Sequence, residues 1–170
     1  MRNVKVIAAE PGKSASAWLK VKPLPVVLKN WFFCKLARIS PGNSNQFFYR
    51  LMGVKIGKNA QIMPSVEMDI FFPELISIGE GAVIGIDCFF ACHEFNPVEF
   101  RYGPISIGKN SLLGARSFVL PGVSIGDGAM VSAQTTVYKD IPSNVFAFGS
   151  PLQFKEINSG KSGAGNKNKK

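Results

Sequence analysis

The sequence predicts an all-β solenoid in which short parallel strands coil about four times, preceded by a short helical arm. The first reason is a period of six. Apolar residues recur without a break at Ile107, Leu113, Val119, Ile125, Val131 and Val137. The spacing continues upstream through Ile56, Ile62 and Met68 and then Ile78, Ile84 and Phe90, if residues 72–75 and 94–104 are insertions. Six residues accommodate one short strand and one corner, so three steps close a coil.

The neighbours of the periodic positions are the second reason. Glycine directly follows six of them, at Gly57, Gly79, Gly85, Gly108, Gly114 and Gly126. Two residues before each periodic position the side chain is small or β-branched, as in Ala60, Ala82 and Ser111. We therefore expect a strand residue beside a corner at each step, with glycine where the chain turns sharply or takes a positive φ.

Counting in eighteens predicts coils at residues 54–71, 76–93, 105–122 and 123–140. Stacking the last two places Ile107 on Ile125, Leu113 on Val131 and Val119 on Val137. Amphipathic helices fit poorly, because they need apolar residues three and four apart and the glycines would weaken them. A β-sandwich would need two-residue hairpin signals such as Asn-Gly between alternating runs, and the sequence has none in that setting.

The basic arm comprises residues 1–53, which carry nine Lys or Arg against Glu10 alone. We expect a helix over residues 24–38 and a second helical turn over residues 45–51. The apolar face of the first helix is predicted to contain Leu24, Val27, Leu28, Trp31, Phe32 and Leu36. That face either packs on the solenoid or contacts a membrane surface.

The ends of the chain differ from its body in charge. The formal net charge of +9 divides into +8 for residues 1–53, −3 for residues 54–154 and +4 for residues 155–170. Basic ends on an acidic body argue against nucleic acid and leave open an acidic membrane surface, an acidic partner protein or simple solubility. Residues 141–157 are expected to pack on the solenoid, and residues 158–170 to form a mobile basic tail.

Cysteine usage and hydropathy indicate the compartment. Cys34, Cys88 and Cys92 are odd in number and lack zinc-type spacing, so we expect reduced thiols. The sequence has no apolar run of 18 residues and no secretory signal pattern at its N-terminus, which predicts a cytoplasmic protein.

Several motifs within residues 50–154 resemble those of a known family. They are Gly-Pro-Ile-Ser-Ile-Gly-Lys-Asn at 103–110, Leu-Leu-Gly-Ala at 112–115, Leu-Pro-Gly-Val-Ser-Ile-Gly-Asp-Gly-Ala at 120–129 and Lys-Asp-Ile-Pro at 139–142. With the six-residue repeat they resemble the hexapeptide-repeat acyltransferases, in particular the maltose, galactoside and xenobiotic O-acetyltransferase branch. The resemblance implies a left-handed parallel β-helix, and the handedness rests on it alone.

The chain has a single histidine, His93, at the end of coil two and directly before the insertion at 94–104. Imidazole can accept a proton from a hydroxyl or amine near neutral pH. The resemblance implies that His93 is the general base of a direct acyl transfer, without an acyl-enzyme intermediate. Asp69 loosely matches an acidic acceptor-binding residue of the family. Asp87, Glu94 and Phe95 are further candidates for binding a small-molecule acceptor, since they lie near His93 in the sequence.

The resemblance also implies coenzyme A as carrier of the acyl group, with acetyl-CoA as the expected co-substrate. The implied contacts are Gly114, Ala115, Ser132, Ala133, Lys139 and Pro151. Three positions depart from the family pattern, namely Leu112, residues 132–134 and Gln153. An acyl carrier protein docking on the basic arms is therefore an alternative donor. No metal is expected, because one histidine cannot build the three-histidine zinc site of related carbonic anhydrases.

Assembly follows from the size of the predicted solenoid. A prism of four coils is thin and leaves flat parallel-strand faces uncovered, so we expect a homotrimer with sites between subunits. The alternative to an enzyme is a trimeric scaffold or sugar-binding module without catalytic activity.

Overall fold

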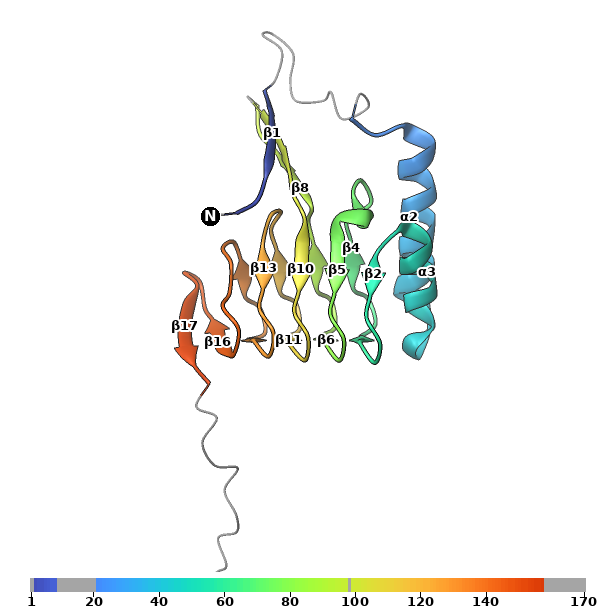
Figure 1. The fold of residues 1–170 in the computed structure, drawn as a ribbon. Coiled ribbons are helices and arrows are strands. Elements are labelled where there is room, and N and C mark those ends of the chain that lie inside the picture. Colours follow the sequence, from blue (N-terminus) through green and yellow to red (C-terminus); the bar gives the residue numbers. More distant parts are fainter. Residues whose placement is uncertain (1, 9–20, 98, 158–170) are drawn as a thin grey trace, which may run out of the picture.

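The computed structural model describes residues 2–8, 21–97 and 99–157. Within them the chain passes repeatedly through three parallel β-sheets whose strands stack along one axis (Figure 1). Residues 9–20 of the basic arm and the expected mobile tail at 158–170 lie outside the described residues.

Each step of the repeat adds one strand to one sheet. The first sheet contains β2 (Lys55–Ile56), β5 (Ile76–Ile78), β10 (Ile105–Ile107) and β13 (Ser124–Ile125). The second contains β3 (Gln61–Ile62), β6 (Val83–Ile84), β11 (Leu112–Leu113) and β14 (Met130–Val131), and continues into β16 (Val145–Phe148) and the antiparallel β17 (Gln153–Glu156). The third contains β4 (Glu67–Met68), β7 (Phe89–Phe90), β12 (Phe118–Val119) and β15 (Thr136–Val137).

The predicted stacking of the periodic residues is confirmed. Ile107 pairs with Ile125, Leu113 with Val131 and Val119 with Val137. The upstream strands join the same columns, because Ile78 pairs with Ile107 and Phe90 with Val119. Eleven of the twelve periodic side chains are buried, and Ile56 at the open end is half-buried. These columns are the core of the solenoid.

The repeated glycines meet a steric requirement. None of the six glycines that follow a periodic residue has a positive φ. Instead, a Cβ atom on Gly79 would lie 2.6 Å from the carbonyl carbon of Gly108 in the next coil. The backbone takes a positive φ two residues further along, at positions such as Asn110 and Arg116. Glycine is therefore selected by the close approach of neighbouring coils, which corrects the expectation of a positive φ at these sites.

Two helices close the open end of the solenoid, as Figure 1 shows. They are α2 (Leu24–Ile39) and α3 (Asn45–Met52), joined by the 3-10 turn η1 (Gly42–Ser44), so the expected helices are present. Within the described part of the chain, no helix is long and apolar enough to cross a membrane.

Polar side chains of the two helices bond to the edge of the first coil. Asn45 Nδ2 donates to the carbonyl of Ile62 at 2.8 Å, Gln46 Nε2 to that of Ala60 at 2.8 Å, and Tyr49 Oη to that of Val66 at 2.7 Å. Asn30 Nδ2 of α2 donates to the carbonyl of Ile70 at 2.9 Å. These carbonyls have no preceding coil to pair with, so the helices satisfy an edge that would otherwise recruit another strand.

The buried face of α2 differs from the predicted one. Val27, Asn30, Cys34 and Ala37 face the solenoid and are buried. The predicted members Leu24, Leu28, Trp31 and Phe32 are instead between 47% and 55% exposed. Apolar residues occur on both sides of this helix, so their spacing alone could not identify the side that packs.

The second insertion forms a projecting β-hairpin. It consists of β8 (His93–Phe95) and β9 (Glu99–Tyr102), which are antiparallel. An unpredicted strand, β1 (Lys5–Ala8), pairs antiparallel with β9 and makes a small three-stranded sheet. The first insertion contains the 3-10 turn η2 (Pro73–Leu75). The hairpin and β1 rise together from one side of the solenoid (Figure 1).

Candidate active site

His93 lies where the chain leaves the third sheet and enters the hairpin. It is the first residue of β8, and its partner across the hairpin is Tyr102 of β9. Its side chain is 18% exposed, so part of the ring is open to solvent.

A buried carboxylate holds the His93 ring. Oδ2 of Asp69, which directly follows β4, lies 2.5 Å from His93 Nδ1. The same oxygen accepts the backbone N–H of Cys92 at 2.7 Å, and Oδ1 accepts those of Phe71 at 2.7 Å and Phe72 at 3.0 Å. An ionised carboxylate only accepts hydrogen bonds, so this arrangement favours the tautomer with the proton on Nδ1 and the lone pair on Nε2.

Asp69 has no exposed side-chain surface, and both of its oxygens are engaged within the chain. In this conformation an acceptor molecule has no access to that carboxylate. The geometry thus connects Asp69 to His93, and it differs from the acceptor contact expected for Asp69 in the sequence analysis.

Aromatic rings surround His93. Phe71 meets its ring edge-on with the centroids 4.6 Å apart, while Phe95 and Phe100 stack on it at 5.5 Å and 5.9 Å. Phe72 lies 6.3 Å away and stacks on Tyr102 at 4.8 Å. Phe71, the last residue of the first predicted coil, and Phe72, the first residue of the insertion, were not among the predicted site residues. The ring therefore sits in an apolar surround with one polar partner, Asp69.

Glu94 and Phe95 point to opposite sides of the hairpin, as successive strand residues do. Phe95 shares the side of His93 and is 55% exposed, which makes it an accessible part of the site. Glu94 Oε1 accepts from Arg2 Nη2 at 2.8 Å on the other side. Glu94 thus attaches the N-terminal segment to the hairpin.

Asp87 lies before β7, whereas His93 lies beyond the other end of that strand. The Asp87 residue takes a positive φ of 57° at an exposed corner, and its Oδ2 lies 3.4 Å from Nε of Arg116. The structure therefore does not bring Asp87 to His93, although the two are close in sequence.

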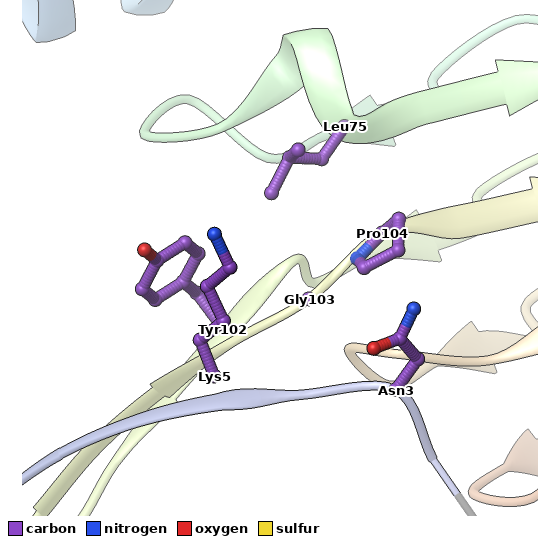
Figure 2. A pocket seen from close by; sticks show the side chains of 6 residues that line it. All are labelled: Asn3, Lys5, Leu75, Tyr102, Gly103 and Pro104. Atoms are coloured by element: carbon purple, nitrogen blue, oxygen red, sulfur yellow. The ribbon is translucent and has the colours of Figure 1, made fainter.

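A hollow of about 260 Å³ opens where β1, the hairpin and η2 meet. It is lined by Asn3, Lys5, Leu75, Tyr102, Gly103 and Pro104. Figure 2 shows the Lys5 side chain alongside the Tyr102 ring, with Leu75 projecting toward them from the other wall. Lys5 Nζ lies 6.0 Å from the Tyr102 ring centroid. Tyr102 is the cross-strand partner of His93, although His93 itself does not line the hollow.

Four of the six residues expected to contact coenzyme A form a ridge along one corner of the solenoid. Gly114 and Ala115 follow β11, and Ser132 and Ala133 follow β14 in the next coil. The two corners pack closely, since a Cβ on Gly114 would lie 2.4 Å from the backbone nitrogen of Ala133. Gly114, Ala115 and Ser132 are half-buried and Ala133 is exposed.

Lys139 and Pro151 lie near each other at the far end of the solenoid. Lys139 Nζ lies 4.6 Å from the ring centroid of Phe154, and the Oη of Tyr138 accepts the backbone N–H of Leu152 at 3.3 Å. These contacts connect the end of β15 to the turn before β17. Both Lys139 and Pro151 are exposed and accessible to a ligand.

The cysteines are free thiols buried in the core. Burial raises the pKa of the Cys92 thiol, and the charges of Asp69 and Glu74 raise it further. Burial also raises the pKa values of Cys34 and Cys88. These thiols are therefore poor nucleophiles at neutral pH. Among the described residues, no group of three or more His, Cys, Asp or Glu side chains could hold a metal ion.

Known proteins resemble this chain over most of its length. A family profile described as "Hexapeptide repeat of succinyl-transferase" matches residues 104–139. A protein of Bacillus subtilis strain 168 named "Putative acetyltransferase YvoF" is 38% identical over 142 residues, which cover 81% of this chain and 83% of that protein. This chain belongs to the hexapeptide-repeat acetyltransferase family. Its family also includes "Putative acetyltransferase SAS0727" of Staphylococcus aureus strain MSSA476, 42% identical over 133 residues covering 77% of this chain and 83% of that protein.

Solved structures share the fold of this hexapeptide-repeat acetyltransferase. A maltose O-acetyltransferase from Clostridium difficile 630 aligns with a TM-score of 0.62 at 18% identity, over 78% of this chain and 86% of its own. A galactoside acetyltransferase in complex with coenzyme A aligns with a TM-score of 0.62 at 22% identity, over 91% and 87% of the two chains. At these identities the likeness concerns the fold, and it implies a left-handed parallel β-helix.

Proposed function

We propose that this protein transfers an acetyl group from acetyl-CoA directly to a hydroxyl or amine of a small acceptor, with His93 as general base. Acyl transfer is the proposed reaction because the chain belongs to the hexapeptide-repeat acetyltransferase family. The observation that carries the assignment to His93 is its contact with buried Asp69, because the carboxylate leaves Nε2 as the proton-accepting nitrogen. The fold in which this occurs is proposed to be a left-handed β-helix of four coils.

In the proposed reaction, His93 Nε2 removes the proton from the acceptor hydroxyl or amine as that atom attacks the thioester carbonyl. The new ester or amide bond forms as the carbon–sulfur bond breaks, and the imidazolium returns the proton to the departing thiolate. Asp69 stabilises the imidazolium charge through Nδ1. Phe71, Phe95 and Phe100 exclude water around the ring and restrict its rotation.

The hollow beside Tyr102 is proposed to receive part of the acceptor. Lys5 meets no carboxylate in the described part of the chain, so its ammonium is available to a polar or anionic group of the acceptor. Phe95 offers an exposed apolar wall on the same side of the hairpin as His93. Glu94 and Asp87 are not proposed as acceptor contacts, because Arg2 and Arg116 already engage them.

The ridge formed by Gly114, Ala115, Ser132 and Ala133 is proposed to bind the pantetheine arm, with Lys139 and Pro151 near the nucleotide. Coenzyme A in the complex of the galactoside enzyme supports the choice of donor. Lys139 would meet a phosphate as a point charge. If the departures at Leu112 and Gln153 weaken this site, an acyl carrier protein is the donor instead.

The deciding experiment measures thiol release from acetyl-CoA with a panel of sugar and amine acceptors. For the acceptor that supports turnover, His93→Ala is expected to lower kcat by about 10²–10⁴-fold. Thermal unfolding of the variant should remain one cooperative transition, at a lower temperature than that of the parent, because the ring packs on aromatic side chains and contacts buried Asp69. A robust rate that His93→Ala leaves unchanged would refute the mechanism. Absence of turnover with every acceptor would favour the scaffold or sugar-binding alternative.

A further inference from the structure

The end cap of the solenoid exposes a group of large apolar side chains, which we call the cap patch. It consists of Leu24, Leu28, Trp31, Phe32 and Ile39 of α2 with Phe47 and Leu51 of α3. Their exposed fractions run from 43% for Leu51 to 81% for Ile39. Large apolar patches on a protein surface mark contacts with other molecules.

Aromatic contacts join the two helices into one surface. Phe32 meets Phe33 with ring centroids 5.6 Å apart, Phe33 stacks on Phe48 at 6.4 Å, and Phe48 meets Phe47 at 5.4 Å. The opposite side of the helices bonds to the edge of the first coil through Asn30, Asn45 and Tyr49. The cap patch is therefore held rigidly and faces away from the solenoid.

The charged side chains of the two cap helices are all positive. The helices contain Lys29, Lys35, Arg38 and Arg50, and neither contains Asp or Glu. Arg38 is paired with Glu67 of the first coil at 2.7 Å, whereas Lys29 and Lys35 are exposed and meet no carboxylate among the described residues. The unpaired lysines lie on the solvent side of α2, alongside Leu28, Trp31 and Phe32.

We propose that the cap patch docks on the surface of an anionic lipid bilayer. A helix with Trp, Phe and Leu on its exposed face, flanked by lysines, is suited to lie in the plane of the membrane interface. The apolar side chains would enter the acyl boundary while the lysine ammonium groups remain at the headgroups. A second copy of this chain fits less well, because face-to-face packing would bring lysines together without a carboxylate between them.

Docking through the cap patch would place the proposed active site close to the bilayer. Lys22, just before α2, pairs with Glu74 of the first insertion, and its Nζ lies 5.0 Å from the ring centroid of Phe72. Phe72 lies 6.3 Å from the His93 ring. The start of α2 is therefore connected by direct contacts to the wall of the site. The docking proposal concerns a different surface and does not depend on the proposed catalytic reaction.

The test uses the full chain and sedimentation with vesicles made of phosphatidylcholine alone or with 30% phosphatidylglycerol. We expect binding to the anionic vesicles at low salt, little binding to the neutral ones, and loss at high salt. Lys29→Glu/Lys35→Glu should weaken partitioning by about 25-fold or more, taking about fivefold for each lost positive charge. Leu28→Ser/Phe32→Ser, which removes two apolar side chains of the patch, should abolish binding to the anionic vesicles.

Matched controls are exposed residues away from the cap. Ile86→Ser changes an apolar side chain that is 45% exposed, and Lys109→Glu reverses an exposed charge on the solenoid, so both should bind like the parent. In a Trp18→Phe background, Trp31 is the sole tryptophan, and its emission should shift to shorter wavelength on anionic vesicles. Failure to bind anionic vesicles at low salt, or equal binding by the cap variants and their controls, would overturn the proposal. A lower assembled mass for Leu28→Ser/Phe32→Ser would do so too, since the patch would then be a subunit interface.

Discussion

The chemistry proposed for His93 depends on one fully buried carboxylate, that of Asp69. Asp69 accepts hydrogen bonds from three backbone N–H groups and from the ring. Such a partner sets the tautomer and orientation of a histidine and stabilises its protonated form. We therefore propose that Asp69 is a positioning residue, whose loss should alter turnover more than acceptor binding.

Asp69→Asn tests this role with little change in size. The amide cannot accept from all four donors, and its NH₂ group favours the tautomer with the proton on Nε2. We expect kcat to fall by about 10²-fold or more with KM changed little, and the pH profile of kcat to move. Asp87→Asn is the matched control, because that carboxylate lies at an exposed corner. A loss of kcat of equal size in both variants would show that Asp69 has no special connection to His93.

Cys92 should be dispensable in spite of its place beside His93. Burial raises the pKa of its thiol, as do the charges of Asp69 and Glu74, so the reactive thiolate is scarce at neutral pH and rises only in strong alkali. Cys92→Ala should keep kcat within about threefold of the parent, since its backbone N–H still reaches Asp69. Iodoacetamide should modify the native thiol slowly at pH 7. Rapid inactivation that acetyl-CoA prevents would contradict this expectation.

The sequence was sufficient to identify His93 as a candidate, because it is the single histidine and lies beside an insertion. It did not predict the contact between His93 and Asp69. Asp69 and His93 lie in different coils and belong to no local motif. The predicted register nonetheless indicates that they are close. Met68 pairs with Phe90, so the residues that follow these two strands lie side by side. Phe71 and Phe72 were missed because they lie at the junction of the first coil and the first insertion, where the six-residue period stops.

At the scale of elements, the cap helices show why a helix prediction was correct in extent but left open which side of the helix packs on the solenoid. The apolar residues of α2 occur on both sides, and the solenoid selects the side that carries Asn30, since an open strand edge needs hydrogen-bond donors. A sequence pattern based on apolar residues treats a buried asparagine as exposed. The pairing of β1 with β9 was also beyond the sequence, because no period or turn connects segments so far apart.

Tyr49 provides a test of the polar cap. Its side chain is fully buried, and its hydroxyl donates to the carbonyl of Val66 at 2.7 Å. Tyr49→Phe should lower the free energy of unfolding by about 1–3 kcal/mol, because that carbonyl loses its partner away from water. Tyr138→Phe is the control: its hydroxyl is bonded too, but the residue is 39% exposed and water can replace the contact. Urea denaturation measures both free energies of unfolding. A loss for Tyr49→Phe no larger than that for Tyr138→Phe would contradict the expected contribution of the buried bond.

At the scale of the molecule, the two halves of the proposed site lie at opposite ends of the third-sheet strands within a single chain. His93 lies beyond the end of a third-sheet strand, whereas the ridge at Gly114 and Ala133 lies before the start of such strands. Between them, the outer face of the third sheet carries Phe89 and Phe118, which stack at 5.0 Å and are only half-buried. A half-buried aromatic pair on a flat sheet suits an interface between copies. We therefore propose a trimer in which His93 of one subunit works with the ridge of its neighbour.

Mixing two inactive variants tests the shared site. His93→Ala removes the base, and Ala133→Trp blocks the ridge at an exposed position, so each homotrimer should be inactive. After the two are unfolded and refolded together, a site made from two different subunits can combine an intact His93 with an intact ridge. Random assembly would make about one quarter of the sites complete, and activity should recover to about that fraction of the parent.

The same mixture distinguishes a shared site from one contained within each chain. If every subunit held its own complete site, each would carry one lesion and the mixture would stay inactive. Light scattering of the parent should give about three times the chain mass of 18.5 kDa, and Phe118→Glu should lower both that mass and the activity, because the charge would be buried at the interface. A parent that is active at the mass of a single chain would contradict the assembly, and recovery by mixing would then have no physical basis.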